Sequence, residues 1–148
     1  MKTLIFVLII SSLLQSTILA IVLVLIILIC RSYIRPDRAN LLLAFGFGLL
    51  NAHLSLTTMG IQSLIYLTLV LMTQSLSKTR LAGNSLLIVP LSLFLLSINQ
   101  MLMALFLHHS VQLFPKVFIE VTLSLPILFL IRFWEERFII RKEIKLRV

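Results

Sequence analysis

Few side chains in this chain of 148 residues could do chemistry. Asp37 and Glu120 are the only acids before the C-terminal tail, Cys30 is the single cysteine, and His108 and His109 stand side by side in a polar segment. Enzymes that act on lipid pyrophosphates need several acids to hold magnesium, and a zinc site would need further ligands near the histidine pair. The sequence also has no glycine-rich phosphate loop. We therefore expect no enzyme, no metal site and no cofactor.

The remaining candidates are polar side chains inside apolar segments. An acid within an apolar helix costs about 3 kcal/mol on insertion scales. Glu120 is therefore expected either at the membrane interface, where a helix N-terminus and Lys116 favour its charge, or buried against a partner. The amides are predicted to hydrogen-bond between helices or, alternatively, to line a ligand site; they are Gln15, Asn51, Asn99 and Gln100.

The composition indicates what surrounds these side chains. Apolar residues make up 60% of the chain and charged residues only 12%, with a mean hydropathy of +1.14. A soluble domain has roughly a quarter of its residues charged, so soluble enzyme folds are excluded. The net charge of +8 could suggest a nucleic-acid partner, but the basic residues form short clusters between apolar runs instead of one solvated face. The composition therefore predicts an integral membrane protein.

Uncharged stretches delimit the elements that must position the polar groups. The predicted helices lie near 40–54, 60–76, 84–107 and 115–132. The patch Ser55–Gly60 has the composition of a turn, and Pro115 suits the first turn of a helix. Pro90 and Pro126 fall inside apolar helices and are predicted to kink them.

Residues 3–30 allow three interpretations. A single helix would be about 42 Å long, which is rather long for one span. A break at Gln15-Ser16-Thr17 would give two short helices near 3–14 and 18–31. A cleaved signal peptide that ends at Ala20 is disfavoured, because Ile18 stands where a small residue is needed and the apolar run continues.

The basic residues predict topology. With six helices, all of the 13 basic residues except Lys116 fall on one face, whereas a five-helix chain also moves Lys2 across. The positive-inside rule therefore favours six helices, with both termini cytoplasmic. Residues 1–132 form the predicted transmembrane bundle. Residues 133–148 form a cytoplasmic amphipathic tail that is either a solvated or lipid-surface anchor or a docking helix.

Small residues recur every fourth position in the helix near 40–54. Ala44, Gly48 and Ala52 form a small-xxx-small face, which lets another helix backbone approach closely. The neighbour is expected to be another helix of the same fold or, alternatively, a helix of a partner protein.

A longer pattern spans residues 10–75. It combines the segment LLQS at 13–16, a short apolar helix that ends at Arg31 before a basic loop, and the segment AFGFGLL at 44–50 with Gly60 after it. This pattern resembles the MreD family of rod shape-determining membrane proteins. The resemblance covers about half of the chain and contains no catalytic signature.

The resemblance implies a fold and partners, with one departure. The family usually has an aspartate four residues after the second glycine of the pattern and another glycine eight residues beyond it; these positions are Ala52 and Gly60 here. Any role of that acid is therefore not carried over. The resemblance implies a fold similar to the substrate-binding subunits of energy-coupling-factor vitamin transporters. It also implies MreC as a partner and, through MreC, RodA and a penicillin-binding transpeptidase.

Two functions remain open from the sequence. The first is a non-catalytic scaffold of bacterial cell-wall elongation in the inner membrane, which acts through helix faces such as that of Gly48. The second is a small-molecule, vitamin-type substrate-binding subunit of a transporter. The second function needs polar groups that converge in a membrane pocket, for which Gln62, Asn99, Gln100 and Glu120 are the candidates.

Overall fold

The computed structural model describes residues 2–17, 22–78, 85–107 and 113–138. Within these ranges the chain forms six α-helices and one short 3-10 helix, with no strand. The elements are α1 Lys2–Thr17, α2 Leu23–Ile34, α3 Arg38–Leu54, α4 Ile61–Lys78, η2 Ser85–Leu87, α5 Ile88–Leu107 and α6 Leu113–Phe138. The predicted all-helical class with six helices is confirmed. His108, His109 and residues 139–148 of the predicted tail lie outside the described ranges.

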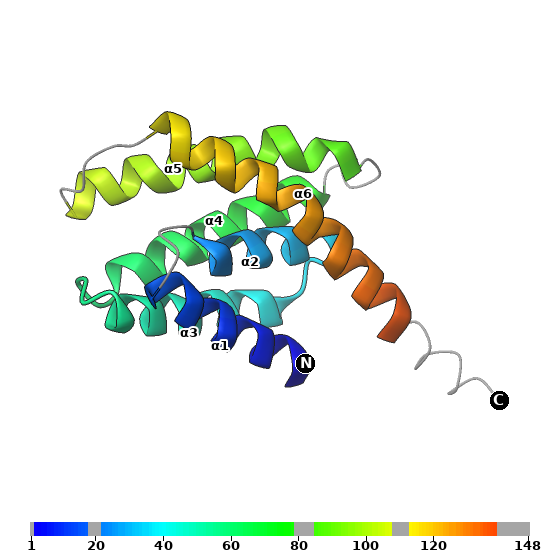
Figure 1. Cartoon of the computed structure of the whole chain (residues 1–148), viewed down its shortest axis with the longest axis horizontal. Coiled ribbons are helices and arrows are strands. Elements are labelled where there is room, and N and C mark those ends of the chain that lie inside the picture. Colours follow the sequence, from blue (N-terminus) through cyan, green and yellow to red (C-terminus); the bar gives the residue numbers. More distant parts are fainter. Residues whose placement is uncertain (1, 18–21, 79–84, 108–112, 139–148) are drawn as a thin grey trace.

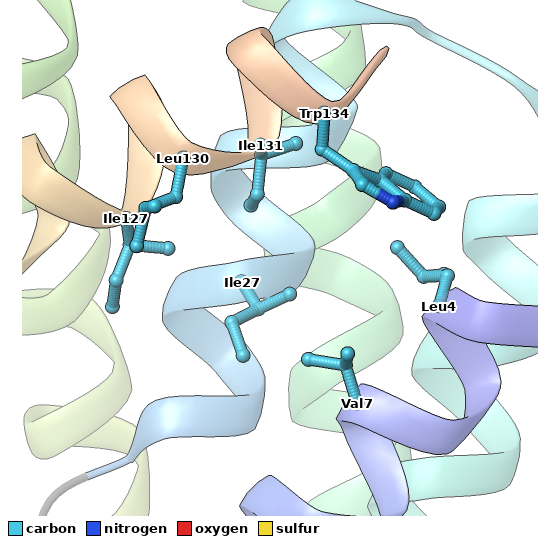
Figure 2. A pocket seen from close by; sticks show the side chains of 7 residues that line it. All are labelled: Leu4, Val7, Ile27, Ile127, Leu130, Ile131 and Trp134. Atoms are coloured by element: carbon cyan, nitrogen blue, oxygen red, sulfur yellow. The ribbon is translucent and has the colours of Figure 1, made fainter. Parts of the chain in front are cut away.

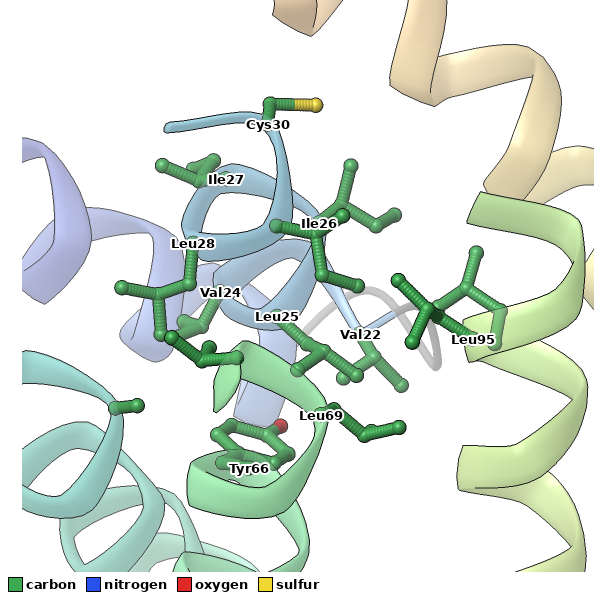
Figure 3. Close-up of a cluster of buried hydrophobic side chains, with 14 of the residues drawn as sticks. Val22, Val24, Leu25, Ile26, Ile27, Leu28, Cys30, Tyr66, Leu69 and Leu95 are labelled. Atoms are coloured by element: carbon green, nitrogen blue, oxygen red, sulfur yellow. The ribbon is translucent and has the colours of Figure 1, made fainter. Parts of the chain in front are cut away.

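α2 is the central helix of the bundle. Every residue from Val24 to Tyr33 is buried, and a helix that is apolar all round must be covered on every side. α1, α3, α4, α5 and α6 each pack against it. Figure 3 shows its side chains beside Tyr66 and Leu69 of α4 and Leu95 of α5. Its 12 residues extend only about 18 Å, so α2 is shorter than a bilayer core.

The stretch 3–30 forms two helices, and the single tilted helix is wrong. α1 and α2 pack together and run in opposite directions (Figure 1). The hydroxyls of Ser16 and Thr17 donate to the carbonyl of Leu13 at 3.0 and 2.7 Å. Such side-chain bonds to the backbone offer the chain an alternative to continuing the helix. The predicted break at residues 15–17 therefore falls a few residues too early, since these residues form the end of α1 and α2 begins at Leu23.

α3 and α4 form a hairpin whose backbones approach closely. A Cβ atom added to Gly48 would lie only 2.5 Å from the Cα of Ser63, so a larger residue would force the helices apart. The predicted turn at 55–60 lies between the two helices. Gly60 has a φ of +100° there, in the left-handed region that glycine adopts without strain.

α5 and α6 form the other hairpin, with the hydroxyl oxygens of Ser92 and Ser124 3.2 Å apart. Pro126 lies inside α6 as predicted. Pro90, however, is the third residue of α5. A proline in the first turn lacks only an N–H that has no helical partner there, so the prediction of an internal Pro90 kink is wrong.

Two of the described helices are long and apolar enough to cross a membrane. These segments are Ile88–Phe106 in α5 and Pro115–Arg137 in α6, whereas α1 and α2 are apolar but shorter. The number of helices therefore matches the prediction, and six membrane crossings remain a prediction.

Successive helices alternate in direction, so the start of α1 and the end of α6 lie at the same end of the bundle (Figure 1). We call this the charged end, because it carries every basic residue of the described ranges except Lys116: Lys2, Arg31, Arg35, Arg38, Lys78, Arg132 and Arg137. The opposite end, where α2 and α6 begin and α3 ends, is the polar end.

Candidate functional site

A network of buried polar side chains surrounds Tyr66 at the polar end. Its hydroxyl oxygen accepts hydrogen bonds from Asn51 Nδ2 at 3.2 Å and from Gln62 Nε2 at 3.4 Å. Thr57 Oγ1 in turn donates to Gln62 Oε1 at 3.2 Å. Tyr66 is fully buried, and Asn51 and Gln62 are also buried. The bond between Asn51 and Tyr66 links α3 to α4. Buried polar groups need such hydrogen-bond partners.

The first turn of α2 is capped by side chains from other helices. Its N-cap residue, Val22, provides no side-chain hydrogen bond, although the first N–H groups of a helix lack helical partners. Glu120 Oε1 of α6 accepts from Val22 N at 3.2 Å, and Gln15 Oε1 of α1 accepts from Val24 N at 3.3 Å. Two neighbouring helices thus supply the caps that the apolar sequence of α2 lacks.

The two groups of contacts belong to one site. The side chain of Gln15 also interacts with the hydroxyl of Tyr66, and Glu120 lies within electrostatic reach of it. We define the polar cluster as the side chains that join α1, α3, α4 and α6 around the start of α2: Gln15, Asn51, Gln62, Tyr66 and Glu120. The sequence singled out four of these residues but not Tyr66. Tyr66 follows Gln62 by four residues and therefore lies on the same face of the helix, which could have indicated its place in the cluster.

The structure shows the buried alternative for Glu120, while its position relative to a membrane interface stays a prediction. Its side chain is fully buried, yet it lies near the end of the bundle, at the N-terminus of α2, where a negative charge is favoured by the helix dipole. Lys116 lies within electrostatic range. The second carboxylate oxygen, Oε2, is buried and has no hydrogen-bond partner among the described residues.

The structure also places Asn99 toward this end. The contact between Ser92 and Ser124 sets the antiparallel register of α5 and α6, and this register puts Asn99 level with Val117, about one turn from Glu120. Asn99 is buried, and within the described ranges its Oδ1 has no hydrogen-bond partner. Gln100 is half-buried on the adjacent position of α5.

The small-residue face of α3 is occupied within the chain. Ala44, Gly48 and Ala52 are all buried, and the backbone of Ser63 fills the space beside Gly48. A partner helix therefore has no access to this face, and its proposed use as a partner surface is wrong. Gly60 belongs to the turn before α4 and not to a helix face, because its backbone adopts a positive φ.

A buried ion pair lies at the charged end, which sequence reasoning missed. Arg31 Nε and Glu135 Oε1 are 3.8 Å apart, and both residues are buried. The sequence assigned Glu135 to a tail that extends the last helix into the cytoplasm. α6 does extend through Glu135, but this side chain is buried instead of solvated. The available signal was the spacing of the buried face of α6, which repeats every three or four residues up to Glu135: Val117, Val121, Ser124, Leu128, Ile131 and Glu135.

No group of three or more metal-ligating side chains occurs among the described residues. Cys30 is buried and its thiol donates to the carbonyl oxygen of Ser124 at 3.6 Å, so it is held between α2 and α6. The polar cluster can join helices, or it can accept a small polar ligand through its unpartnered oxygens.

No family model, curated protein or solved structure matches this chain.

Proposed function

We propose that this protein is a multi-pass protein of the bacterial inner membrane. The observation that carries this proposal is the distribution of its side chains. Phe6, Leu42 and Leu130 are between 65% and 76% exposed, whereas Glu120 and Asn99 are at most 1% exposed. A protein in water would favour the opposite arrangement, while lipid favours apolar side chains outside and satisfied polar groups inside.

The charged end would face the cytoplasm. Basic residues mark the cytoplasmic side of membrane proteins, and this end carries seven of the eight basic residues in the described ranges. Trp134 and the nearby arginines of α6 would then lie at the depth where aromatic and basic side chains anchor a helix. Both termini would then be cytoplasmic, and α5 and α6 would cross the bilayer fully, since their lengths suit it.

Within the membrane, the protein would act as a non-catalytic scaffold of the elongation machinery that builds the cell wall. The resemblance of residues 10–75 to the MreD family supports this role and suggests MreC as the direct partner, with RodA and a penicillin-binding transpeptidase bound through MreC. Since the Gly48 face is occupied by α4, the outer faces of α5 and α6 are the better partner surface. They carry large exposed apolar side chains, which can pack against a partner helix.

Site-specific photocrosslinking in native membranes tests this role. A photoreactive residue in place of Phe118, which is 73% exposed on α6, is expected to capture MreC. The same residue in place of Leu42, which is 76% exposed on α3, is the matched control and is expected to capture less. Recovery of a transporter ATPase module in place of MreC would contradict the scaffold role.

A specific observation favours a second candidate, the substrate-binding subunit of a vitamin-type transporter. Asn51 Oδ1, Asn99 Oδ1 and Glu120 Oε2 are buried and have no hydrogen-bond partners among the described residues. Binding of water-soluble vitamins to the purified protein, measured as a rise in melting temperature, tests this candidate. A rise that is lost in Asn99→Leu but kept in Ser97→Ala would favour transport over scaffolding.

A further inference from the structure

An apolar groove of about 300 Å³ lies over α2, between α1 and α6 (Figure 2). Leu4, Ile27 and Ile131 form its floor and are buried, whereas Val7 and Leu130 form its rims and are 49% and 67% exposed. The groove is therefore open on its outer side, along the surface that faces lipid in the proposed membrane protein. Trp134 lines the part nearest the charged end (Figure 2).

One end of the groove lies near the basic residues of the charged end. Arg31 follows Ile27 by four residues on the same face of α2, as Glu135 follows Ile131 on α6. Arg35 comes directly after α2, is exposed, and lies within electrostatic reach of both Arg31 and Glu135. In the described ranges, the charged end holds seven basic residues against three acids: Asp37, Glu135 and Glu136.

We propose that this groove binds an anionic phospholipid, with one acyl chain along Ile27 and Ile131 and the phosphate on Arg35. An acyl chain fits the groove because its lining is wholly apolar and its side is open. An anionic headgroup fits the end because basic pockets between helices on the cytoplasmic side attract such lipids. This inference rests on the membrane location proposed above, but not on the scaffold role or its partners.

Trp134 reports on the groove directly, because it is the only tryptophan in the chain. The full-length protein is reconstituted in phosphatidylcholine vesicles that contain a minor fraction of lipid with brominated acyl chains, which quench tryptophan fluorescence on contact. Brominated phosphatidylglycerol is expected to quench Trp134 with about fivefold higher apparent affinity than brominated phosphatidylcholine, the factor expected for one arginine near an anionic headgroup.

Paired variants separate the headgroup contact from the chain contact. Arg35→Gln is expected to remove the preference for phosphatidylglycerol, whereas Arg38→Gln, at the start of α3, retains it. Val7→Phe is expected to fill the groove and to reduce quenching by both lipids, while Ile9→Phe, which lies outside the groove lining on the same helix, does not. Circular dichroism and gel filtration verify that each variant is folded.

Each of the following results would overturn the proposal. Equal quenching by the two brominated lipids, or a preference that survives in Arg35→Gln, would contradict the anionic site and leave the proposed function intact. Quenching that rises as the protein is diluted in the vesicles would show that a second copy of the chain fills the groove. Absence of quenching by any brominated lipid would contradict lipid in the groove, and recovery of the protein outside the vesicles would contradict the membrane location and with it both proposals.

Discussion

The two ends of α2 are held by the same neighbouring helix through different chemistry. At the polar end, Glu120 accepts a hydrogen bond from the backbone of Val22 at 3.2 Å. At the charged end, Glu135 pairs with Arg31 at 3.8 Å. Both arrangements suit the dipole of α2, which favours a negative charge at the N-terminus of the helix and a positive charge at its C-terminus.

The ends differ in how their stabilisation is distributed. The polar end shares several hydrogen bonds among five helices, most of them between neutral groups, so that the loss of one partner leaves the others in place. The charged end has a buried ion pair, and removal of Glu135 takes a counter-charge away from the buried Arg31, which also lies within electrostatic reach of Asp37. We therefore expect the charged end to be the more sensitive to single substitutions.

The largest expected effect is that of Glu135→Leu. Removing one member of a buried pair costs about 3–5 kcal/mol of unfolding free energy. Glu136→Leu is the matched control, because Glu136 pairs with Arg132 at 3.1 Å but both side chains are more than half exposed; its loss should cost about 0.3–0.5 kcal/mol. Denaturant titration in detergent, followed by circular dichroism, measures both, and equal costs would contradict the distinction between buried and exposed pairs.

Tyr66→Phe probes the polar end. The substitution removes the oxygen that accepts from Asn51 and Gln62, so it is expected to cost about 1–3 kcal/mol. Thr68→Val removes an exposed hydroxyl that donates to its own helix and should change the unfolding free energy by less than about 0.5 kcal/mol. A Tyr66→Phe cost as large as that of Glu135→Leu would show that the polar end is not the more tolerant one.

A pair of glycine variants measures the contribution of close helix packing, for comparison with the polar contacts at the two ends. Gly48→Ala would place a methyl group against the backbone of Ser63 and is expected to destabilise the protein by about 1–3 kcal/mol. Gly46 has no atom within 4 Å of an added Cβ, so Gly46→Ala should instead stabilise α3 by up to about 1 kcal/mol. Thermal melting of the two variants in the same detergent gives opposite shifts if the helix contact is as described.

Glu120→Gln separates charge from hydrogen bonding at the polar end. The amide oxygen can still accept from Val22, so only the interactions of the negative charge with the helix N-terminus and with Lys116 are lost. We expect a cost of about 0.3–1 kcal/mol. A cost close to that of Glu135→Leu in the same denaturant titration would mean that the charge of Glu120 has a further partner.

The smallest net effect is expected of the double variant Arg31→Met/Glu135→Leu. Replacing both members of a buried ion pair by apolar residues of similar volume is often neutral or stabilising. The double variant should therefore recover the stability lost in Glu135→Leu. If the double variant is no more stable than Glu135→Leu, the loss has another origin than the removal of the Glu135 counter-charge from Arg31.

Much of the helix layout was predictable because it depends on local signals. The turn at 55–60, the end of α1 at the polar residues Gln15–Thr17 and a helix start near Pro115 follow from turn residues and proline geometry within a few positions. The contacts of Glu120 and Glu135 were not predictable in the same way. Both contacts depend on how α2 packs against α6. Glu120 and Glu135 are also far along the chain from their partners, Val22 and Arg31.

By itself, the sequence determined that the chain is helical, apolar and basic at one end, because hydropathy and charge spacing act over short distances. Only the tertiary structure decided which helix is central and which polar groups meet. α2 has no residue that can cap its own N-terminus, so its position is fixed by side chains of α1 and α6. The small-residue face around Gly48 can pack against any helix that approaches closely. Only the structure shows that this helix is α4 of the same chain.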